Sequence, residues 1–253
     1  MTKPFLILQF RPDDRAADNE YEAFLKWGGI PSANAVRIRM EKTQQLALNL
    51  DDYAGVIMGG SPFNVSDSIV EKTVIQRRSE QLAFSLMQEV MERDFPCLGI
   101  CYGLGILGSC CNGLISKEKY SEEVGVVDIH LTGAGKKDPI TKGMPGVFPA
   151  IVGHKEACQY LPPGTELLAY SATCPTQLVR YKHNVYATQF HPELDDEGVK
   201  VRAYVYKEAG YFPASEVEEI IRRTSGKNLI HPVKILRNFV SMYADTSGIN
   251  KGF

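Results

Sequence analysis

The chain has 253 residues, of which 44% are hydrophobic and 23% are charged, and its formal net charge is −2. This composition is typical of a globular protein, and we expect one domain over residues 1–253 rather than two small ones. The lysines and arginines are scattered along the chain without a basic surplus, so nucleic acid is not an expected partner.

The cysteines and the N-terminal segment favour a cytoplasmic protein. The six cysteines form no C-x-x-C pair, which suits a reducing compartment better than a framework of disulfides. The first ten residues, MTKPFLILQF, contain an apolar run too short for a signal peptide or a membrane span, and they lack a small-residue cleavage site. We therefore expect no membrane partner, and we interpret this run as the first strand.

The N-terminal third alternates between strand and helix patterns. Apolar runs predict strands buried on both faces of a parallel sheet, at residues 4–10, 36–40 and 53–58. The i, i+3, i+4 spacing around Phe24 predicts a helix that ends at Gly28-Gly29. A longer helix is predicted at 68–93, because a capping box opens it at Ser68 and an apolar stripe follows.

The segment 96–108 has the layout of a strand, a tight turn and a helix, and the turn carries one thiol. An apolar run reaches the pentapeptide GICYG at 99–103 and continues into a second, helix-compatible run. A nucleophile on such a bend needs glycines two residues to either side, here Gly99 and Gly103, so that neighbouring backbone can pass close. The helix N-terminus also favours the thiolate form, which makes Cys101 a candidate nucleophile.

Two other interpretations of this segment stay open at this point. In the first, Cys101 only packs in the core, since free cysteines are among the most buried residue types. In the second, Gly103, Gly105 and Gly108 form the G-x-G-x-x-G fingerprint of a dinucleotide site, with Asp128 near the end of the next strand-like run. A single match of this kind is weak evidence, so the rest of the chain must decide.

The C-terminal half begins with a charged stretch at 116–124, which we interpret as a solvated loop. Short strands are then predicted at close spacing, at residues 123–131, 147–152, 166–170, 176–181 and 185–190. Helical patterns follow at 199–208 and 214–223, and Pro232 opens a last helix at its favoured first position.

The last predicted strand runs into the motif QFHPE at 189–193, which supplies what a thiol nucleophile needs. A cysteine nucleophile requires a base, and the base requires an acceptor that fixes its tautomer. His191 and Glu193 are two residues apart at a strand end, where alternation places both side chains on one side. A metal site formed by these two with Asp195 and Asp196 lacks a recognisable ligand spacing, so we expect no metal.

Two further places follow predicted strands. Gly59-Gly60 ends one strand, where a plain turn is the simplest interpretation and a close approach of backbone to a ligand is the alternative. Of the remaining histidines, only His154 follows a strand, directly after Gly153, so it is the one placed to approach the site.

The chain resembles the class I (triad) glutamine amidotransferases over roughly residues 4–243, and most closely their stand-alone, GMP-synthase-like members. The motifs that carry the likeness occur in the same order, namely Gly59-Gly60, GICYG at 99–103, Gly153-His154 and QFHPE at 189–193. The resemblance implies a flavodoxin-like three-layer α/β/α fold with a mostly parallel central sheet. Gly105 and Gly108 then lie inside a helix, and the dinucleotide interpretation loses weight.

The resemblance also implies roles for individual residues. Cys101, His191 and Glu193 match the catalytic triad, and the backbone N–H groups of Gly60 and Tyr102 match the oxyanion hole. Contacts to the substrate are implied at Gly59, Gly105, Gly153 and His154.

The chain departs from the family pattern in two places. Members commonly have glutamine four residues after the nucleophile, where it helps to bind the substrate, and this chain has Gly105. The path from the QFHPE motif to the last helix is also longer than usual, and we interpret 195–226 as a helical addition near the mouth of the site.

The expected reaction is hydrolysis of the glutamine side-chain amide through a cysteine thioester, which gives glutamate and ammonia without a cofactor. Because the amidotransferase-like domain takes up the whole chain, an ammonia-accepting synthase would have to be a separate protein. Hydrolysis of γ-glutamyl peptides or amides is an alternative, favoured by Gly105. A non-catalytic or partner-dependent regulatory module is a second alternative, and the intact Cys101, His191 and Glu193 argue against it.

Overall fold

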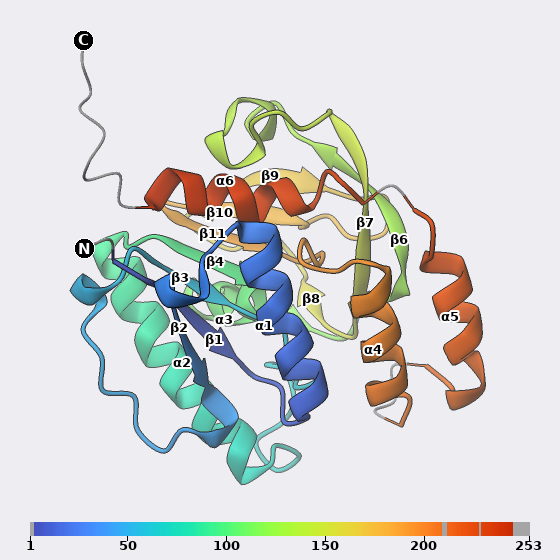
Figure 1. The fold of residues 1–253 in the computed structure, drawn as a ribbon, viewed down its shortest axis with the longest axis horizontal. Coiled ribbons are helices and arrows are strands. Elements are labelled where there is room, and N and C mark those ends of the chain that lie inside the picture. Colours follow the sequence, from blue (N-terminus) through green and yellow to red (C-terminus); the bar gives the residue numbers. More distant parts are fainter. Residues whose placement is uncertain (1–2, 209–211, 228, 245–253) are drawn as a thin grey trace.

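The computed structural model describes residues 3–208, 212–227 and 229–244, and the chain folds around a nine-stranded sheet (Figure 1). Its strand order is β2-β1-β3-β4-β11-β10-β9-β6-β7. The parallel strands are β2 (Ala35–Arg39), β1 (Phe5–Gln9), β3 (Gly55–Met58), β4 (Cys97–Ile100) and β11 (Val185–Thr188). The antiparallel ones are β10 (Leu178–Tyr181), β9 (Thr165–Tyr170), β6 (Glu122–Leu131) and β7 (Val147–His154). A small separate sheet pairs β5 (Ile115–Ser116) with β8 (Ala157–Cys158).

Helices cover both faces of this sheet, which confirms the three-layer α/β/α prediction (Figure 1). The larger helices of these two layers are α1 (Asp14–Gly28) and α6 (Val233–Tyr243) on one face and α2 (Val74–Arg93) and α3 (Tyr102–Cys110) on the other. Short 3-10 helices lie at Ser32–Asn34, Met40–Lys42, Leu50–Asp52, Gly135–Lys137, Pro139–Thr141 and Ala214–Glu216.

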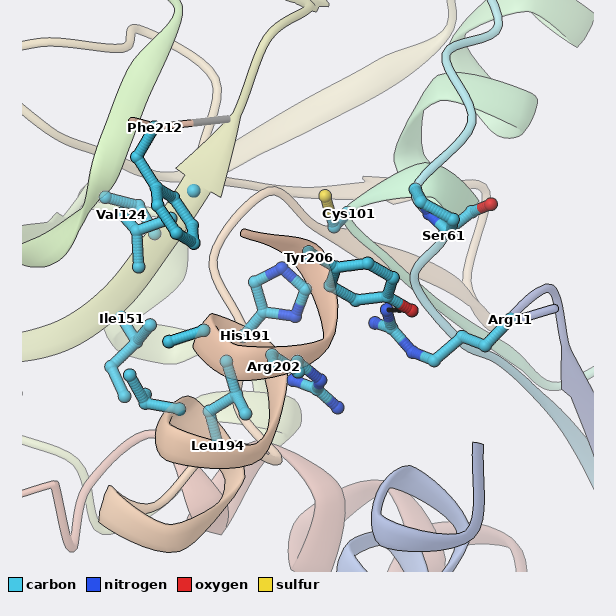
Figure 2. A pocket seen from close by; sticks show the side chains of 15 residues that line it. Arg11, Ser61, Cys101, Val124, Ile151, His191, Leu194, Arg202, Tyr206 and Phe212 are labelled. Atoms are coloured by element: carbon cyan, nitrogen blue, oxygen red, sulfur yellow. Dashed lines mark hydrogen bonds between the residues drawn. The ribbon is translucent and has the colours of Figure 1, made fainter. Parts of the chain in front are cut away.

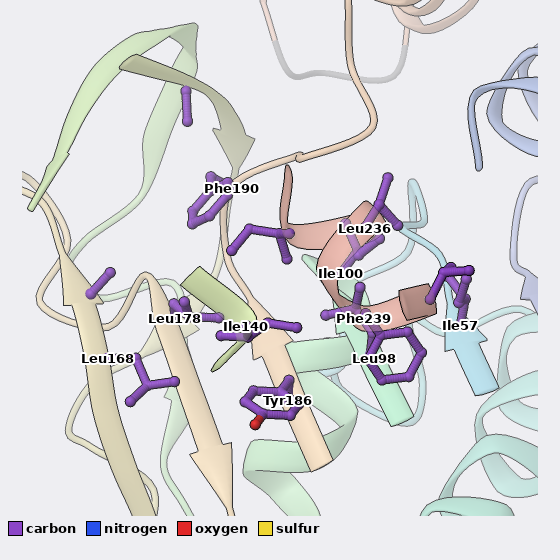
Figure 3. Close-up of a cluster of buried hydrophobic side chains, with 14 of the residues drawn as sticks. Ile57, Leu98, Ile100, Ile140, Leu168, Leu178, Tyr186, Phe190, Leu236 and Phe239 are labelled. Carbon is purple, nitrogen blue, oxygen red and sulfur yellow. The ribbon is translucent and has the colours of Figure 1, made fainter. Parts of the chain in front are cut away.

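Alternation along the buried strands produces two cores. Phe5 and Ile7 of β1 join the cluster that contains Phe239 of α6, shown in Figure 3. Leu6 and Leu8, the residues between and after them, join the cluster on the opposite face with α2 and α3. Side chains of successive strand residues point to opposite faces, so a continuous apolar run is what a strand covered on both sides requires.

A third, smaller core lies beside β7 and is formed with α4 (Asp196–Tyr206) and α5 (Val217–Thr224). Val199 and Ala203 of α4 pack there against Ile151 of β7. Both helices fall within the segment 195–226, for which helical structure is predicted. In the described part of the chain, no helix has the length and apolar character needed to cross a membrane.

The predicted start of α2 at Ser68 is wrong by about one and a half turns. Ser68 and Glu71 do form their side-chain hydrogen bond, at 2.7 Å, but they close only a single turn. Lys72 then donates to the carbonyl of Val65 and to the carboxylate of Glu80, which folds this turn back against the helix. The helix begins after Thr73, whose hydroxyl accepts from the Gln76 amide at 3.1 Å.

Two other predicted boundaries are corrected. Pro232 is the N-cap of α6 rather than its first residue. Glu122 belongs to β6 and is buried, although the stretch around it is predicted to be a solvated loop. Its carboxylate is held by buried polar groups described below, and a charge count along the sequence cannot detect such partners.

The structure explains why a glycine, Gly99, precedes the bend. The stability of a Gly99 variant tests this explanation. A Cβ atom at Gly99 would lie 2.9 Å from the backbone carbonyl carbon of Gly103. We expect Gly99→Ala to lower the free energy of unfolding by roughly 1–3 kcal/mol, because backbone must move to make room. Urea unfolding measures the change.

Gly133→Ala is the matched control, because a Cβ atom there has nothing within 4 Å. It should leave the urea midpoint unchanged. A Gly99→Ala protein as stable as the parent chain would contradict the close approach.

Candidate active site

Cys101 lies at the bend between β4 and α3 in a backbone conformation that a non-glycine residue rarely adopts. Its φ is 52° and its ψ is −90°. Such a residue costs of the order of 1–3 kcal/mol and persists where its surroundings determine it. The Cys101 amide donates to the carbonyl of Thr188 at 2.7 Å, and Gly99 and Gly103 allow the close backbone contacts. The prediction of a strand, tight turn and helix is therefore confirmed.

The structure of this segment disagrees with both competing interpretations, the dinucleotide fingerprint and a cysteine that only packs in the core. Gly105 and Gly108 lie inside α3, where a Cβ at Gly108 would meet Ile115 at 2.8 Å, so these glycines serve packing. Cys101 is half-buried and packs against the first core, yet it also lines two cavities. It is neither a wholly buried core residue nor an exposed surface thiol.

The Cys101 thiol is in a desolvated environment, which corrects the expectation of a stabilised thiolate. Burial raises the pKa of Cys101 to about 12, while the positive charge of Arg11 acts in the opposite direction. Gln189 also directs its side-chain N–H toward Sγ, at 3.7 Å. The resting thiol is consequently protonated, and a base must remove its proton before it can attack.

His191 and Glu193 follow β11 and form a buried pair. The His191 amide donates to the carbonyl of Ile151 at 2.9 Å, which ties this segment to β7. His191 Nδ1 lies 2.9 Å from Glu193 Oε1, and the Glu193 side chain is fully buried. Nδ1 therefore carries a proton toward the carboxylate, and Nε2 is the ring nitrogen left to exchange protons. Figure 2 shows the His191 ring beside Cys101 in one cavity.

Arg202 of α4 is a second partner of Glu193 that the sequence patterns do not indicate. Its Nη1 donates to Glu193 Oε1 at 2.9 Å. Burial alone would raise the pKa of Glu193, but the neighbouring His191 and Arg202 outweigh that effect and hold it well below its usual value. Glu193 is therefore a carboxylate in the folded protein.

Arg11, two residues after the end of β1, completes a buried charge cluster with Glu20 of α1. Arg11 Nε donates to Glu20 Oε1 at 2.7 Å, and Arg202 Nη2 lies 3.7 Å from the same oxygen. Two guanidinium groups thus alternate with two carboxylates beside His191. These residues are separated by up to 191 positions, so only the fold brings them together.

Gly60 and Tyr102, for which the resemblance implies an oxyanion hole, lie near His191 and directly after Cys101. A Cβ atom at Gly60 would lie 2.8 Å from Arg11 Nη2 and 3.1 Å from His191 Cε1, so this loop passes directly beside the histidine. Tyr102 is the first residue of α3, and an N–H in that position has no acceptor within its own helix. Gly59 has a different environment, because a Cβ there would meet the Glu20 carboxylate at 2.7 Å, and it lines neither cavity.

Two cavities meet at Cys101. The first, which we call the amide cavity, has about 340 Å³ of empty space, open solvent included, and is lined by Gly105, His154, Lys155, Glu156 and Gln189, among others. The second, the α4 cavity, has about 560 Å³ of empty space, again with open solvent included, and its lining includes Arg11, Gly153, His191, Arg202, Tyr206 and Phe212. Gly153 and His154, consecutive residues of β7, therefore line different cavities.

His154 is fixed by hydrogen bonds at both ring nitrogens. Nε2 lies 2.7 Å from Glu122 Oε2, and Nδ1 lies 2.9 Å from the carbonyl of Glu156. Glu122 also accepts from Gln177 at 2.7 Å and from the hydroxyl of Thr173. Burial would raise the pKa of Glu122, but the bonds from His154 and Thr173 lower it. Although Cys174 lies near enough to make a three-ligand metal set with Glu122 and His154, this network already uses the carboxylate and the imidazole.

Glu156 occupies the space beside Gly105, and no sequence pattern indicates it. Its carboxylate accepts from the amides of Val65 and Ser66 at 2.7 and 2.8 Å. A Cβ at Gly105 would lie 3.1 Å from Val65 and 3.4 Å from Glu156. The space in which the resemblance implies a glutamine side chain is therefore filled by residues from other segments.

A family model described as "Glutamine amidotransferase class-I" matches residues 31–200. Among similar sequences, a GMP synthase [glutamine-hydrolyzing] of Borrelia garinii subsp. bavariensis is 28% identical over 143 residues, which cover 56% of this chain and 24% of that protein. A GMP synthase [glutamine-hydrolyzing] subunit of Methanococcus maripaludis is 26% identical over 171 residues, which cover 67% and 78%. The chain thus spans about a quarter of the first relative and most of the second.

Solved structures agree with the observed layers. A glutamine amidotransferase of Thermotoga maritima has a TM-score of 0.71 at 17% identity and covers 96% of this chain and 98% of its own. A glutamine amido transferase of Methylobacillus flagellatus has a TM-score of 0.72 at 18% identity, covering 96% and 94%. The fold is therefore the flavodoxin-like fold of these proteins, as predicted, and with the family model matching more than half of its residues, the chain belongs to the class-I glutamine amidotransferase family.

Proposed function

We propose that this protein hydrolyses the side-chain amide of glutamine through a thioester on Cys101. The observation that carries the proposal is the arrangement of His191, which shares a cavity with Cys101 while its Nδ1 lies 2.9 Å from Glu193. A nucleophile on a bend, a base beside it and a buried carboxylate behind the base are the three parts of a covalent hydrolase.

The protonation states of the site set the order of the steps. Nε2 of His191 accepts the proton of the Cys101 thiol as Sγ attacks the amide carbon, and Glu193 stabilises the imidazolium that results. The N–H groups of Gly60 and Tyr102 stabilise the negative charge that develops on the amide oxygen. His191 then transfers its proton to the departing nitrogen, the carbon–nitrogen bond breaks, and ammonia leaves. Water finally hydrolyses the thioester, which releases glutamate and restores the thiol.

The amide cavity is where we place the rest of the glutamine. It is lined by polar groups from the backbone and side chains near Lys155, Glu156 and Gln189, which suits the α-amino and carboxylate ends of an amino acid. His154 then acts by holding this wall in place, because both of its ring nitrogens are already engaged. Gly105 lines this cavity beside Glu156, whereas Gly153 lines the α4 cavity.

We further propose that ammonia is used by a separate synthase protein, and that α4 and α5 are an addition to the family's fold. The M. maripaludis relative, which is named as one subunit of a GMP synthase, supports the first point. The six cysteines are unpaired, which supports a reducing, cytoplasmic location. The regulatory alternative lacks support in the site, since a merely structural domain has no need of a strained, cavity-lining cysteine beside a buried histidine–carboxylate pair.

Cys101→Ala tests the covalent step. We expect it to reduce glutamate release from glutamine by a factor of about a thousand or more, because no thioester can form. Cys110→Ala is the matched control, since Cys110 is another half-buried thiol of the same strand–helix segment and lines neither cavity. Most of the activity surviving in Cys101→Ala would refute the mechanism.

The two partners of the nucleophile should differ in their effects. His191→Ala removes the group that moves the proton, whereas Glu193→Gln keeps a hydrogen-bonding side chain and removes only its charge. We expect kcat to fall further in His191→Ala than in Glu193→Gln. Equal losses in steady-state assays would assign Glu193 a different role.

The raised pKa of Cys101 predicts how its alkylation depends on pH. Since the thiolate is the reactive form and the pKa is about 12, the iodoacetamide rate at Cys101 should rise about tenfold per pH unit from 7 to 10. The difference between the parent chain and Cys101→Ala isolates this thiol from the other five. A plateau near neutral pH would instead indicate a resting ion pair with His191.

A further inference from the structure

The α4 cavity is larger than the proposed reaction with glutamine requires. Ammonia, the group that leaves from glutamine, is about the size of a water molecule. The cavity beside Cys101 and His191 nevertheless has about 560 Å³ of empty space, part of it open to solvent, which is many times the space that one ammonia molecule occupies. Since we place the γ-glutamyl part of the substrate in the amide cavity, the α4 cavity, which Cys101 also lines, is left for the group on the amide nitrogen.

One wall of this cavity is apolar. It is formed by Val124 of β6, Ile151 of β7, Leu194 after the QFHPE motif, Val199 of α4 and Phe212. Figure 2 shows the Phe212 ring beside Val124, on the far side of His191 from Arg11. Residues from four separate segments converge here, so an apolar group of a ligand would be removed from water on several sides.

The opposite wall offers a donor. Arg11 is 3% exposed, and its Nε and Nη1 are used by Glu20 and by the hydroxyl of Tyr206, at 2.7 and 3.1 Å. Within the described ranges its Nη2 donates no hydrogen bond, although it lies close to the Gly60 loop at the reacting centre. This N–H group is placed to receive a carboxylate or carbonyl oxygen of a ligand in the cavity.

We infer that the α4 cavity is a leaving-group subsite for γ-glutamyl dipeptides whose second residue is large and apolar. The inference rests on the proposed function, since it uses the same nucleophile and base. Sγ of Cys101 forms the thioester with the γ-carbonyl carbon, the carbon–nitrogen bond breaks, and His191 transfers its proton to the amino group of the departing amino acid. Water then cleaves the thioester, so the products are glutamate and an apolar amino acid. The side chain of that amino acid packs on the apolar wall, and its carboxylate faces Arg11.

A comparison of three substrates tests binding of the leaving group in the α4 cavity separately from the hydrolysis of glutamine. We would measure kcat/KM for γ-glutamyl-phenylalanine, γ-glutamyl-glycine and glutamine. The two dipeptides share a carboxylate and differ only in the side chain of the second residue. Burial of a phenyl ring raises kcat/KM by about tenfold to a hundredfold. We expect γ-glutamyl-phenylalanine to exceed γ-glutamyl-glycine by at least about tenfold. Equal values would overturn the inference.

A cavity-filling variant ties the preference to α4. Ala203 lines the cavity, whereas Lys200 lies exposed on the same helix. Ala203→Leu should remove most of the preference for γ-glutamyl-phenylalanine over γ-glutamyl-glycine, and Lys200→Leu should retain it. A preference that survives Ala203→Leu would overturn the inference, and Ala203→Val offers a milder change if the leucine variant does not fold.

Binding to Cys101→Ala distinguishes failure of the inference from failure of the proposed function. Calorimetry with this variant compares the affinities of the two dipeptides without turnover. Hydrolysis of glutamine with no dipeptide preference supports the proposed function and overturns the subsite. Tighter binding of γ-glutamyl-phenylalanine by about tenfold, with no hydrolysis by the parent chain, supports the subsite and overturns the hydrolase. Neither hydrolysis nor selective binding overturns both.

Discussion

The parallel pairing of β4 with β11 is the constraint on which the site depends. Ile100 is paired with Thr188, so the residues that follow them in each strand, Cys101 and the 189–193 motif, emerge at the same edge of the sheet. The 2.7 Å hydrogen bond from the Cys101 amide to Thr188 continues that pairing into the bend. A shift of this register would separate the thiol from His191 even if each strand kept its own structure. Both strands are buried on both faces, and the two cores therefore hold the register in place.

The buried charges beside His191 are stabilised only as a set. Glu193 has no exposed surface, and isolating a carboxylate there would carry a large desolvation cost. His191 and Arg202 offset that cost, while Arg11 and Arg202 are in turn close to Glu20. Arg202 comes from α4, so the packing of this helix against β7 is coupled to the electrostatics of the proposed base. A change in α4 would then act on the candidate triad as well as on the cavity beside it.

Much of the fold follows from local patterns in the sequence. The parts that these patterns do not predict are determined by contacts between residues that are far apart in the chain. Continuous apolar runs identify β1, β3 and β4, because only a strand covered on both faces can be apolar throughout. The capping box predicts a start of α2 that is too early, because Lys72 makes hydrogen bonds to Val65 and Glu80. The charge pattern predicts that Glu122 lies in a loop, because its partners are 32 to 55 residues away in the sequence.

The site is predicted only in part. Cys101, His191 and Glu193 stand in recognisable motifs, whereas Arg11, Glu156 and Arg202 do not. The pKa of the thiol is also beyond the reach of sequence patterns, because a helix N-terminus is visible in a sequence and desolvation is not.

Gly105 lines the amide cavity, and its neighbours limit the space there. A glutamine at this position would have to share space with Val65 and Glu156, whose carboxylate is held by two backbone amides. The amide cavity is thus narrowed at Gly105, and the α4 cavity has the larger empty space of the two. In the proposed reaction the amide cavity holds the acyl group and the α4 cavity holds the leaving group. Binding energy that a glutamine-specific site obtains from the acyl side can be obtained here from the apolar wall of β6, β7 and α4. Such a distribution favours a substrate that has a substantial group on its amide nitrogen, since only that substrate makes contact with both cavities.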